Sequence, residues 1–460
     1  MSSDGCKNAE KGRQICGGRR KMQEISEKKS GKLQVWLIFM CVFAYTVSYV
    51  SRYSYNANIV AIREYYGADN ASAGLAGTFY FFAYGAGQVV NGLLCRRYNK
   101  KYCIAAALLI SAAMNAFLFF SPAFAAYKWL WLINGAALSV LWSSLVSVLA
   151  AHLSDGYLKQ GVLFMSMSVA IGTCISYGTS ALFMKIATFR AAFLFAAVLA
   201  GAFAACWFFV YDGLTKPLQS ARNAERAEET AKTGRVGRIE ADAGTRRKAR
   251  VRGGDLAAVF IVPGVLAAIV NLIKDGLNTW VPEILKTSFG YGNSLSLTLT
   301  LVLPLLGMGG SALALWLHKK IGNFLILCGV IYLAETFAVA GITAILRSGN
   351  TGAAAGGATV ALFGGVSLFA HSVNGALTSV APMLLREKYE SGKMAGILNG
   401  SAYVGSTISA YGLGAIADKS GWNGVFLLLL ALSALATVLS FAVPALEKLR
   451  KKKGENEAKK

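Results

Sequence analysis

The chain is poor in charge, proline and histidine. Only 15% of its 460 residues are Asp, Glu, Lys or Arg, whereas a soluble protein of this size carries about 25%. The three histidines show no metal-ligand spacing, and the eight cysteines include no CxxC pair, which excludes the common zinc and redox motifs. A phosphate-cradling loop, GxSxG and HExxH are also missing. We therefore expect neither an enzyme nor a bound cofactor or metal.

Long apolar blocks make up much of the chain instead. Hydrophobic residues make up 55% of the chain, and the mean hydropathy is +0.49. The blocks are about 20 residues long, the length of a membrane-spanning helix. We predict twelve spans: 33–61, 72–95, 102–122, 127–151, 160–186, 190–211, 256–286, 294–318, 322–346, 355–385, 393–417 and 422–446. Since continuous blocks in lipid must be helical, the expected fold class is an all-α membrane protein.

Basic residues indicate which side of the membrane each connection occupies. About 37 of the 46 Lys and Arg residues fall in the two tails, in alternate connections (96–101, 212–255, 318–320 and 386–393) and at Lys159. The positive-inside rule places these segments, and both termini, in the cytoplasm of a cell whose plasma (inner) membrane holds the protein. The net charge of +23 is then explained by a basic membrane rim, so we expect the lipid bilayer and not nucleic acid as partner.

The charge pattern also divides the chain into segments. We expect a cytoplasmic tail at 1–32, a six-helix half at 33–211, a polar linker at 212–255, a second six-helix half at 256–446 and a basic tail at 447–460. The linker carries the sequence GTRRKARVRGG near its end, which is typical of a flexible segment resting on anionic lipid. Some thirty polar residues precede the first apolar run, which favours a membrane anchor over a cleavable signal peptide.

Two spans carry a cation at equivalent positions. Arg52 and Lys274 are separated by 222 residues, and polar neighbours repeat with the same offset. The two trios are Tyr49, Arg52 and Asn56 in the first span, and Asn271, Lys274 and Asn278 in the seventh. The spacing i, i+3, i+7 places each trio on one face of a helix, and Tyr45 extends the first face. A cation at bilayer depth costs about 3 kcal/mol or more. Its repetition predicts an anion site between two pseudo-symmetric halves.

Other polar residues in the spans leave alternatives open. Arg52 could instead be paired with a buried carboxylate, and Lys274 could pair within the bundle, although helix geometry does not require pairing with its neighbour Asp275. Glu335 could carry a proton or sodium ion or serve as a counter-ion of either cation. His371 could relay a proton or simply pack through a hydrogen bond. Gly396 and Gly400 have the GxxxG spacing that permits close helix contact.

At these residues the sequence resembles the major facilitator superfamily, and within it the organophosphate:phosphate antiporter family. The resemblance covers most of the apolar part. It is carried by YTVSYVSRYSYNAN in the first span, NGAALSVLW at 134–142, DGLNTWVPEIL at 275–285, and GILNGSAYVGS followed by GWNGVFLLLL near the end. The resemblance implies a twelve-helix fold of two pseudo-symmetric halves that carries a small anionic solute.

The resemblance also assigns residues to the site. It implies that Arg52 and Lys274 hold phosphate, with pocket tyrosines at Tyr45, Tyr49, Tyr84 and Tyr403. The chain departs from the family pattern at four places. The family's basic residue in span 7 is usually Arg rather than Lys274, its cavity lysine becomes Gln88, its pocket histidine becomes Val169, and the acid expected after span 2 is replaced by Arg96. A less charged pocket suits a carboxylate or another weak anion as well as phosphate.

Three hypotheses follow. The first is a monomeric antiporter that exchanges an organic phosphate for phosphate by alternating access. The second is a proton- or sodium-coupled symporter of a carboxylate or other small solute, in which Asp275 or Glu335 titrates. The third is a transporter-like membrane sensor of sugar phosphate. Candidate binding residues are Arg52, Lys274, Tyr45, Tyr49, Asn56, Tyr84, Gln88, Asn271, Asn278 and Tyr403; candidate coupling or counter-ion residues are Asp275, Glu335 and His371.

Overall fold

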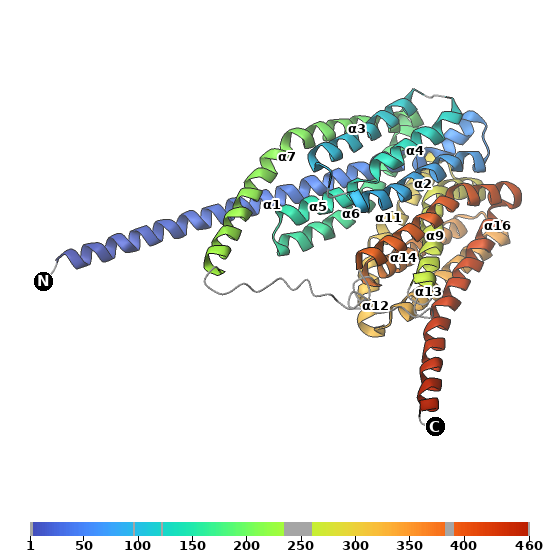
Figure 1. Ribbon diagram of the computed structural model, residues 1–460. Coiled ribbons are helices and arrows are strands. Elements are labelled where there is room, and N and C mark those ends of the chain that lie inside the picture. The colour runs from blue at the N-terminus through green and yellow to red at the C-terminus, as the bar shows by residue number, and fades with distance from the viewer. Residues whose placement is uncertain (1–2, 95–96, 121–122, 234–259, 382–390, 459–460) are drawn as a thin grey trace.

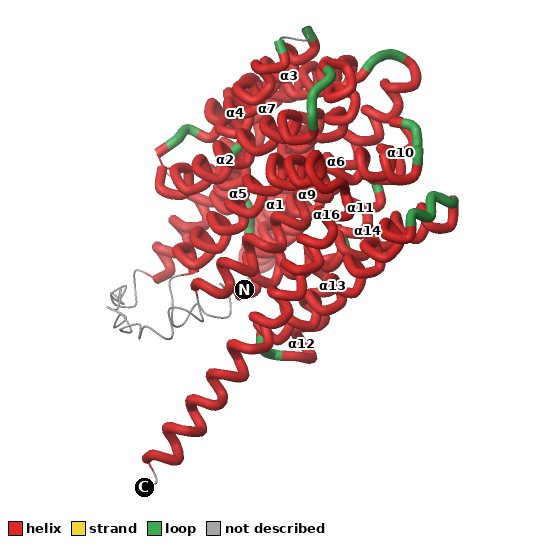
Figure 2. Tube along the Cα trace, turned by 90° about the vertical axis from the view of Figure 1, so that its right-hand side faces the viewer, coloured by secondary structure: helices red, strands yellow, loops and turns green. Residues whose placement is uncertain are grey.

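The described residues fold almost entirely into helices. The computed structural model describes residues 3–94, 97–120, 123–233, 260–381 and 391–458. The first half comprises α1 (Ser3–Tyr66), α2 (Asn70–Leu94), α3 (Lys100–Phe119), η2 (Phe124–Ala126), α4 (Tyr127–Leu138), α5 (Leu141–His152), α6 (Asp155–Ile186) and α7 (Phe189–Thr233). The second comprises α9 (Val262–Phe289), α10 (Asn293–Thr300), α11 (Val302–Gly307), α12 (Gly310–Ile321), α13 (Phe324–Ser348), α14 (Ala353–Gly375), η4 (Ala376–Val380) and α16 (Ser391–Ala458). The halves lie side by side (Figures 1 and 2).

The helices account for the twelve predicted spans. Nine of the described stretches are long and apolar enough to cross a membrane. One of them, Gly396–Leu446, covers two spans, because Gly421 takes a left-handed φ of 66° and breaks the helix within α16. The helices α2, with 25 residues, and α9, with 28 residues, are not among these nine but are also long enough to span a membrane. With them the described helices account for the expected twelve spans.

Several helix ends differ from the sequence-based boundaries. Helix α7 continues to Thr233, so the first part of the predicted linker is helical. In the tenth span, α14 gives way after Gly375 to the wider π-helical turn η4. Helices α1 and α16 extend past the bundle into the two tails (Figure 1). Arg96, GTRRKARVRGG and residues 386–390 lie outside the described residues.

Side-chain caps and small residues fix where helices begin and how closely they pack. The side chains of Asn99 and Asn323 accept hydrogen bonds from the backbone at the starts of α3 and α13, which satisfies amides that would otherwise lack a partner. Gly405 lies directly against the backbone of Ala268 in α9, where a Cβ would stand 1.9 Å from the carbonyl oxygen. Close helix contact was also predicted at Gly396 and Gly400. A Cβ at either position would meet no atom within 4 Å, so the close approach occurs elsewhere on α16.

Polar contacts between the halves gather at one end of the bundle, which we call the closed end. It is the end where α1 and α9 finish. Arg63 forms an ion pair of 2.6 Å with Glu283, and Glu64 pairs with Lys286. Asp418 accepts hydrogen bonds from the backbone amides of Asn70 and Ala71 at the start of α2. Halfway along the bundle, the Asn56 amide donates to Thr279 at 2.8 Å. The contacts of Arg63, Glu64 and Asp418 hold the two halves together at the closed end.

Candidate functional site

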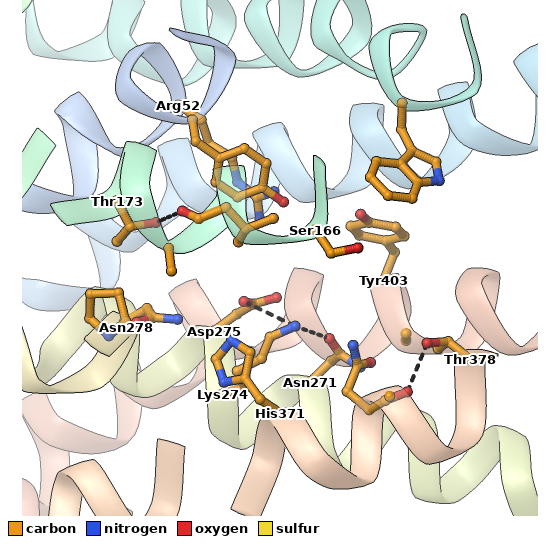
Figure 3. Close-up of a pocket in the computed structure, with 18 of the residues that line it drawn as sticks. Arg52, Ser166, Thr173, Asn271, Lys274, Asp275, Asn278, His371, Thr378 and Tyr403 are labelled. Carbon is orange, nitrogen blue, oxygen red and sulfur yellow. Dashed lines mark hydrogen bonds and ion pairs between the residues drawn. The ribbon is translucent and has the colours of Figure 1, made fainter. Parts of the chain in front are cut away.

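A cavity of about 350 Å³ lies between the halves, within the size range of small-molecule sites. Both halves line it, and Figure 3 shows the facing side chains. Its lining runs from Tyr53 and Asn278 near the middle of the bundle to Gln88, Ser166 and Asn399. Those last three residues lie in the parts of α2, α6 and α16 that are remote from the closed end. The cavity therefore extends from the bundle centre toward the end that carries the basic segments.

Arg52 is surrounded by aromatic rings and forms no ion pair with a carboxylate in the described part of the chain. Its side chain is buried, and its guanidinium carbon lies 5.0 to 5.5 Å from the centres of five rings. The rings belong to Tyr49, Tyr53, Tyr80, Phe81 and Tyr84. Cation–π attraction is worth about 0.5–2 kcal/mol per good contact, so the rings stabilise the cation without neutralising it. An anion in the cavity would meet a full positive charge.

Lys274 has a different environment. Its ammonium donates to the Asn271 side-chain oxygen at 2.6 Å and lies 3.7 Å from the Asp275 carboxylate. Asn271 in turn donates to the side chain of Asn374 at 2.9 Å. The other Asp275 oxygen accepts from Ser406 at 2.5 Å. Neighbouring residues in a helix do not face each other, yet the flexible lysine stem brings Lys274 back to Asp275, and this pairing is shown as a dashed line in Figure 3.

The rest of the lining is rich in groups that hydrogen-bond hydroxyls. His371 Nδ1 lies 2.9 Å from the backbone oxygen of Ser367. Because a carbonyl only accepts, Nδ1 carries the hydrogen, and Nε2 is an acceptor when the ring is neutral. Amide and hydroxyl side chains complete the lining: Gln88, Ser166, Thr173, Ser311, Asn374, Thr378 and Asn399. Tyr84 and Tyr403 meet across the halves with ring centres 5.1 Å apart.

The structure brings together nearly all residues selected from the sequence. Arg52, Lys274, Tyr45, Tyr49, Tyr84, Gln88, Asn271, Asn278 and Tyr403 all line the cavity, as do Asp275 and His371. Asn56 does not, because its amide is turned toward Thr279 and joins α1 to α9. The first two positions of each trio therefore line the cavity in both halves. At the third position Asn278 lines the cavity, whereas Asn56 bonds to Thr279.

Glu335 lies away from the cavity. It is fully buried in α13, and neither of its carboxylate oxygens has a hydrogen-bond partner among the described residues. The described ion pairs do not include it, and the acid beside Lys274 is Asp275. The expectation that Glu335 is the counter-ion of Lys274 or Arg52 is therefore wrong. Helical spacing could not reveal this, because it does not tell which neighbour each face of α13 meets.

Several lining residues were missed by sequence reasoning. They are Trp142, Ser166, Thr173, Ser311, Asn374, Thr378 and Asn399. Asn374 and Thr378 are four residues apart and share a helix face, which is a usable signal. The signal is not specific, however, since Ser54 and Asn115 are equally polar mid-span residues that bond each other at 2.7 Å within the first half.

Comparison with known proteins agrees with this architecture. Residues 41–387 match the Major Facilitator Superfamily. The chain is 23% identical over 429 residues to a protein of Chlamydia pneumoniae named "Probable hexose phosphate transport protein", covering 91% of this chain and 92% of the relative. A 102-residue stretch is 28% identical to "Membrane sensor protein UhpC" of Escherichia coli (strain K12), covering 22% of each chain.

Solved structures show the same fold. A bacterial homologue of the human lysosomal transporter Spinster superposes with a TM-score of 0.67 at 13% identity, covering 89% of this chain and 97% of that one. A D-xylose–proton symporter superposes with a TM-score of 0.64 at 14% identity, covering 91% and 97%. With a family match across three quarters of its length and this fold, the chain belongs to the Major Facilitator Superfamily and is a multi-pass membrane transporter.

Proposed function

We propose that the protein carries a sugar phosphate across the plasma membrane in exchange for inorganic phosphate. The observation that carries this proposal is the buried Arg52, which lines the cavity without a carboxylate partner among the described residues and faces Lys274 on the other half. A buried charge without a partner costs several kcal/mol, so a bound anion relieves this cost. Arg also fits phosphate oxygens with two parallel donors. The hexose-phosphate names of its relatives support the same class of solute.

The neutral part of the lining suits the sugar. The side chains of Gln88, Asn374 and Asn399 supply both donors and acceptors, and His371 adds an acceptor. A polyol needs such mixed partners, since each hydroxyl donates one hydrogen and accepts others. Trp142, which packs against Tyr45 with ring centres 5.1 Å apart, offers an apolar wall. Phosphate would bind at the two cations, and the hydroxyls would reach the amides.

Transport would proceed by alternating access. In this structure the halves are bonded at the closed end, and the cavity extends toward the basic end. If the basic segments and both termini are cytoplasmic, as the positive-inside rule suggests, the cavity is reached from the cytoplasm. Rocking of the two halves about the cavity would break the closed-end contacts and make new ones at the other end. We propose that a monomer is sufficient, because one chain supplies both cations.

The test is uptake by the purified protein in liposomes. A thermal-shift screen of organic phosphates, carboxylates and sugars identifies the solute, and radiolabelled solute then measures exchange against internal phosphate. Arg52→Ala should lower exchange at least about 30-fold, because removing one member of a buried charged contact costs about 2–5 kcal/mol. Arg52→Lys should recover part of it. The matched control is Arg347→Ala, which removes an exposed arginine at the end of α13.

Each rival hypothesis predicts a different outcome. Full exchange by Arg52→Ala would refute the anion site. Uptake that needs no internal phosphate and collapses with an uncoupler would indicate the symporter. A protein that binds sugar phosphate with the expected dependence on Arg52 but never moves it would indicate the sensor. The partial match to a membrane sensor is the reason to measure binding separately from transport.

A further inference from the structure

In the described part of the chain, three charged side chains line the cavity, and their charges do not cancel. Arg52 and Lys274 each contribute one positive charge and Asp275 contributes one negative charge. His371, which donates from Nδ1 to the Ser367 carbonyl, is counted as neutral, the predominant form of a histidine with an ordinary pKa at pH 7. Among the residues that the structure describes, the charged side chains that line the cavity therefore sum to one positive charge. A site built from the two cations alone would carry two.

Asp275 is a fixed part of this site. Its side chain is 3% exposed, Ser406 donates to one oxygen at 2.5 Å, and Lys274 lies 3.7 Å from the other. It is also within electrostatic range of Arg52. Figure 3 shows its carboxylate between the labelled Arg52 and Lys274 side chains. An anion held by both cations would thus lie beside a carboxylate in a low-dielectric space, where like charges repel strongly.

Asp275 faces titratable groups on four other helices. On its own helix the charged neighbour is Lys274. The groups that interact with it from packed elements are Arg52, Tyr49 and Tyr53 of α1, Tyr177 of α6, His371 of α14 and Tyr403 of α16. Among these partners, His371 is the one whose ordinary pKa lies near neutrality. The experiment must therefore separate the effect of His371 from that of Asp275.

We propose that Asp275 restricts the cavity to anionic groups that carry a single negative charge, so that a phosphate monoester is bound with one proton more than it carries in neutral solution. This inference rests on the proposed function and adds the charge state of its substrate. The second ionisation of a phosphate ester has a pKa of about 6. The extra proton resides on the ester, which then carries one negative charge. The same solute would bind as a dianion if Asp275 were neutral.

The test compares two sugar esters that differ in charge. Glucose 6-phosphate loses its second proton between pH 5.5 and 7.5, whereas glucose 6-sulfate keeps one negative charge throughout. Calorimetric titration of the purified full chain should show that glucose 6-phosphate binds about 20-fold more weakly at pH 7.5 than at pH 5.5, the factor by which its monoanion is depleted. Glucose 6-sulfate should change by less than about threefold, because its charge is constant.

Asp275→Asn is the decisive variant. Asparagine keeps the oxygen that accepts from Ser406, so the fold should tolerate it. With the negative charge removed, glucose 6-phosphate should bind at pH 7.5 at least as tightly as at pH 5.5. His371→Gln is the control, and it should keep the wild-type dependence on pH, because His371 contributes no charge to the sum.

The outcomes separate the two proposals. If glucose 6-phosphate binds wild type equally well at both pH values, or if Asp275→Asn keeps the wild-type dependence, the charge assignment is overturned and the anion site stands. Loss of the dependence in His371→Gln alone would also overturn it. If neither ester binds wild type at either pH, sugar-ester recognition fails, and this inference fails with it.

Discussion

Two buried acids show how differently a carboxylate can be accommodated in this bundle. Glu283 is 1% exposed and pairs with Arg63, whereas Glu335 is fully buried with both oxygens unpartnered among the described residues. An unsatisfied buried polar group costs about 1–3 kcal/mol. Glu335 therefore lowers stability, while Glu283 neutralises a cation at the closed end.

Exchanging each acid for an apolar residue of similar length should have opposite effects. Glu335→Met should raise the midpoint of thermal unfolding in detergent, because it removes an unpaired polar group. Glu283→Met should lower that midpoint, because Arg63 loses its partner. Exchange by Glu335→Met in liposomes should remain within about twofold of wild type, because substitutions away from a functional site usually have effects of that size or smaller. Loss of exchange with intact binding would instead assign Glu335 to ion coupling.

At the scale of elements, the contact between α9 and α16 depends on the lack of a side chain. Gly405 lies against the Ala268 carbonyl, which belongs to the helix backbone and cannot turn aside. Overpacking of this kind costs about 1–3 kcal/mol. Small residues at helix interfaces are a general device in membrane proteins, and here they hold the helix that carries Lys274.

Gly405→Ala should therefore separate α9 from α16. We expect a lower unfolding midpoint and weaker binding of sugar phosphate, because Asp275 would move relative to Ser406. Gly396→Ala is the matched control, since its Cβ would meet nothing within 4 Å. Thermal unfolding of both variants decides the point; equal midpoints would show that the bundle absorbs the extra methyl group.

Most of the fold could be predicted because each span is a long apolar block with its own helical period. The cavity residues followed from the same period, since Tyr45, Tyr49 and Arg52 must share a face. Facts that depend on a partner helix could not be predicted. Asn56 meets Thr279 rather than the cavity, and Lys274 bends back to Asp275. The residue pattern within one helix does not show which neighbouring helix each of its faces contacts.

At the scale of the whole molecule, the closed end is held by paired charges on opposite halves. Arg63 is 24% exposed and Glu283 is 1% exposed, so this pair is partly shielded from water. Glu64 also accepts from Asn293 at 3.2 Å, in addition to its pair with Lys286. Opening this end would require all of these contacts to separate together.

Reversing the charge of Arg63 should shift the equilibrium between molecules whose closed end is shut and molecules in which this end is open. Arg63→Glu places two acids together and should weaken the closed end by about 3 kcal/mol, roughly a 100-fold change in population. The double variant Arg63→Glu with Glu283→Arg restores opposite charges and should recover closure. Hydrogen–deuterium exchange of the first turns of α2 and the last turns of α9 reports the change. Equal exchange in the single and double variants would show that the pair does not hold the end shut.

The position of Arg63 on α1 has a mechanical consequence. Eleven residues separate it from Arg52 along one continuous helix, a rise of about 16 Å and just over three turns. Both arginines thus project from one side of a stiff rod. A tilt of about 10° pivoting at Arg52 would displace Arg63 by about 3 Å, more than its 2.6 Å ion pair with Glu283 can follow. Solute binding that tilts α1 about Arg52 would therefore separate an ion pair at the other end of the cavity-lining helix.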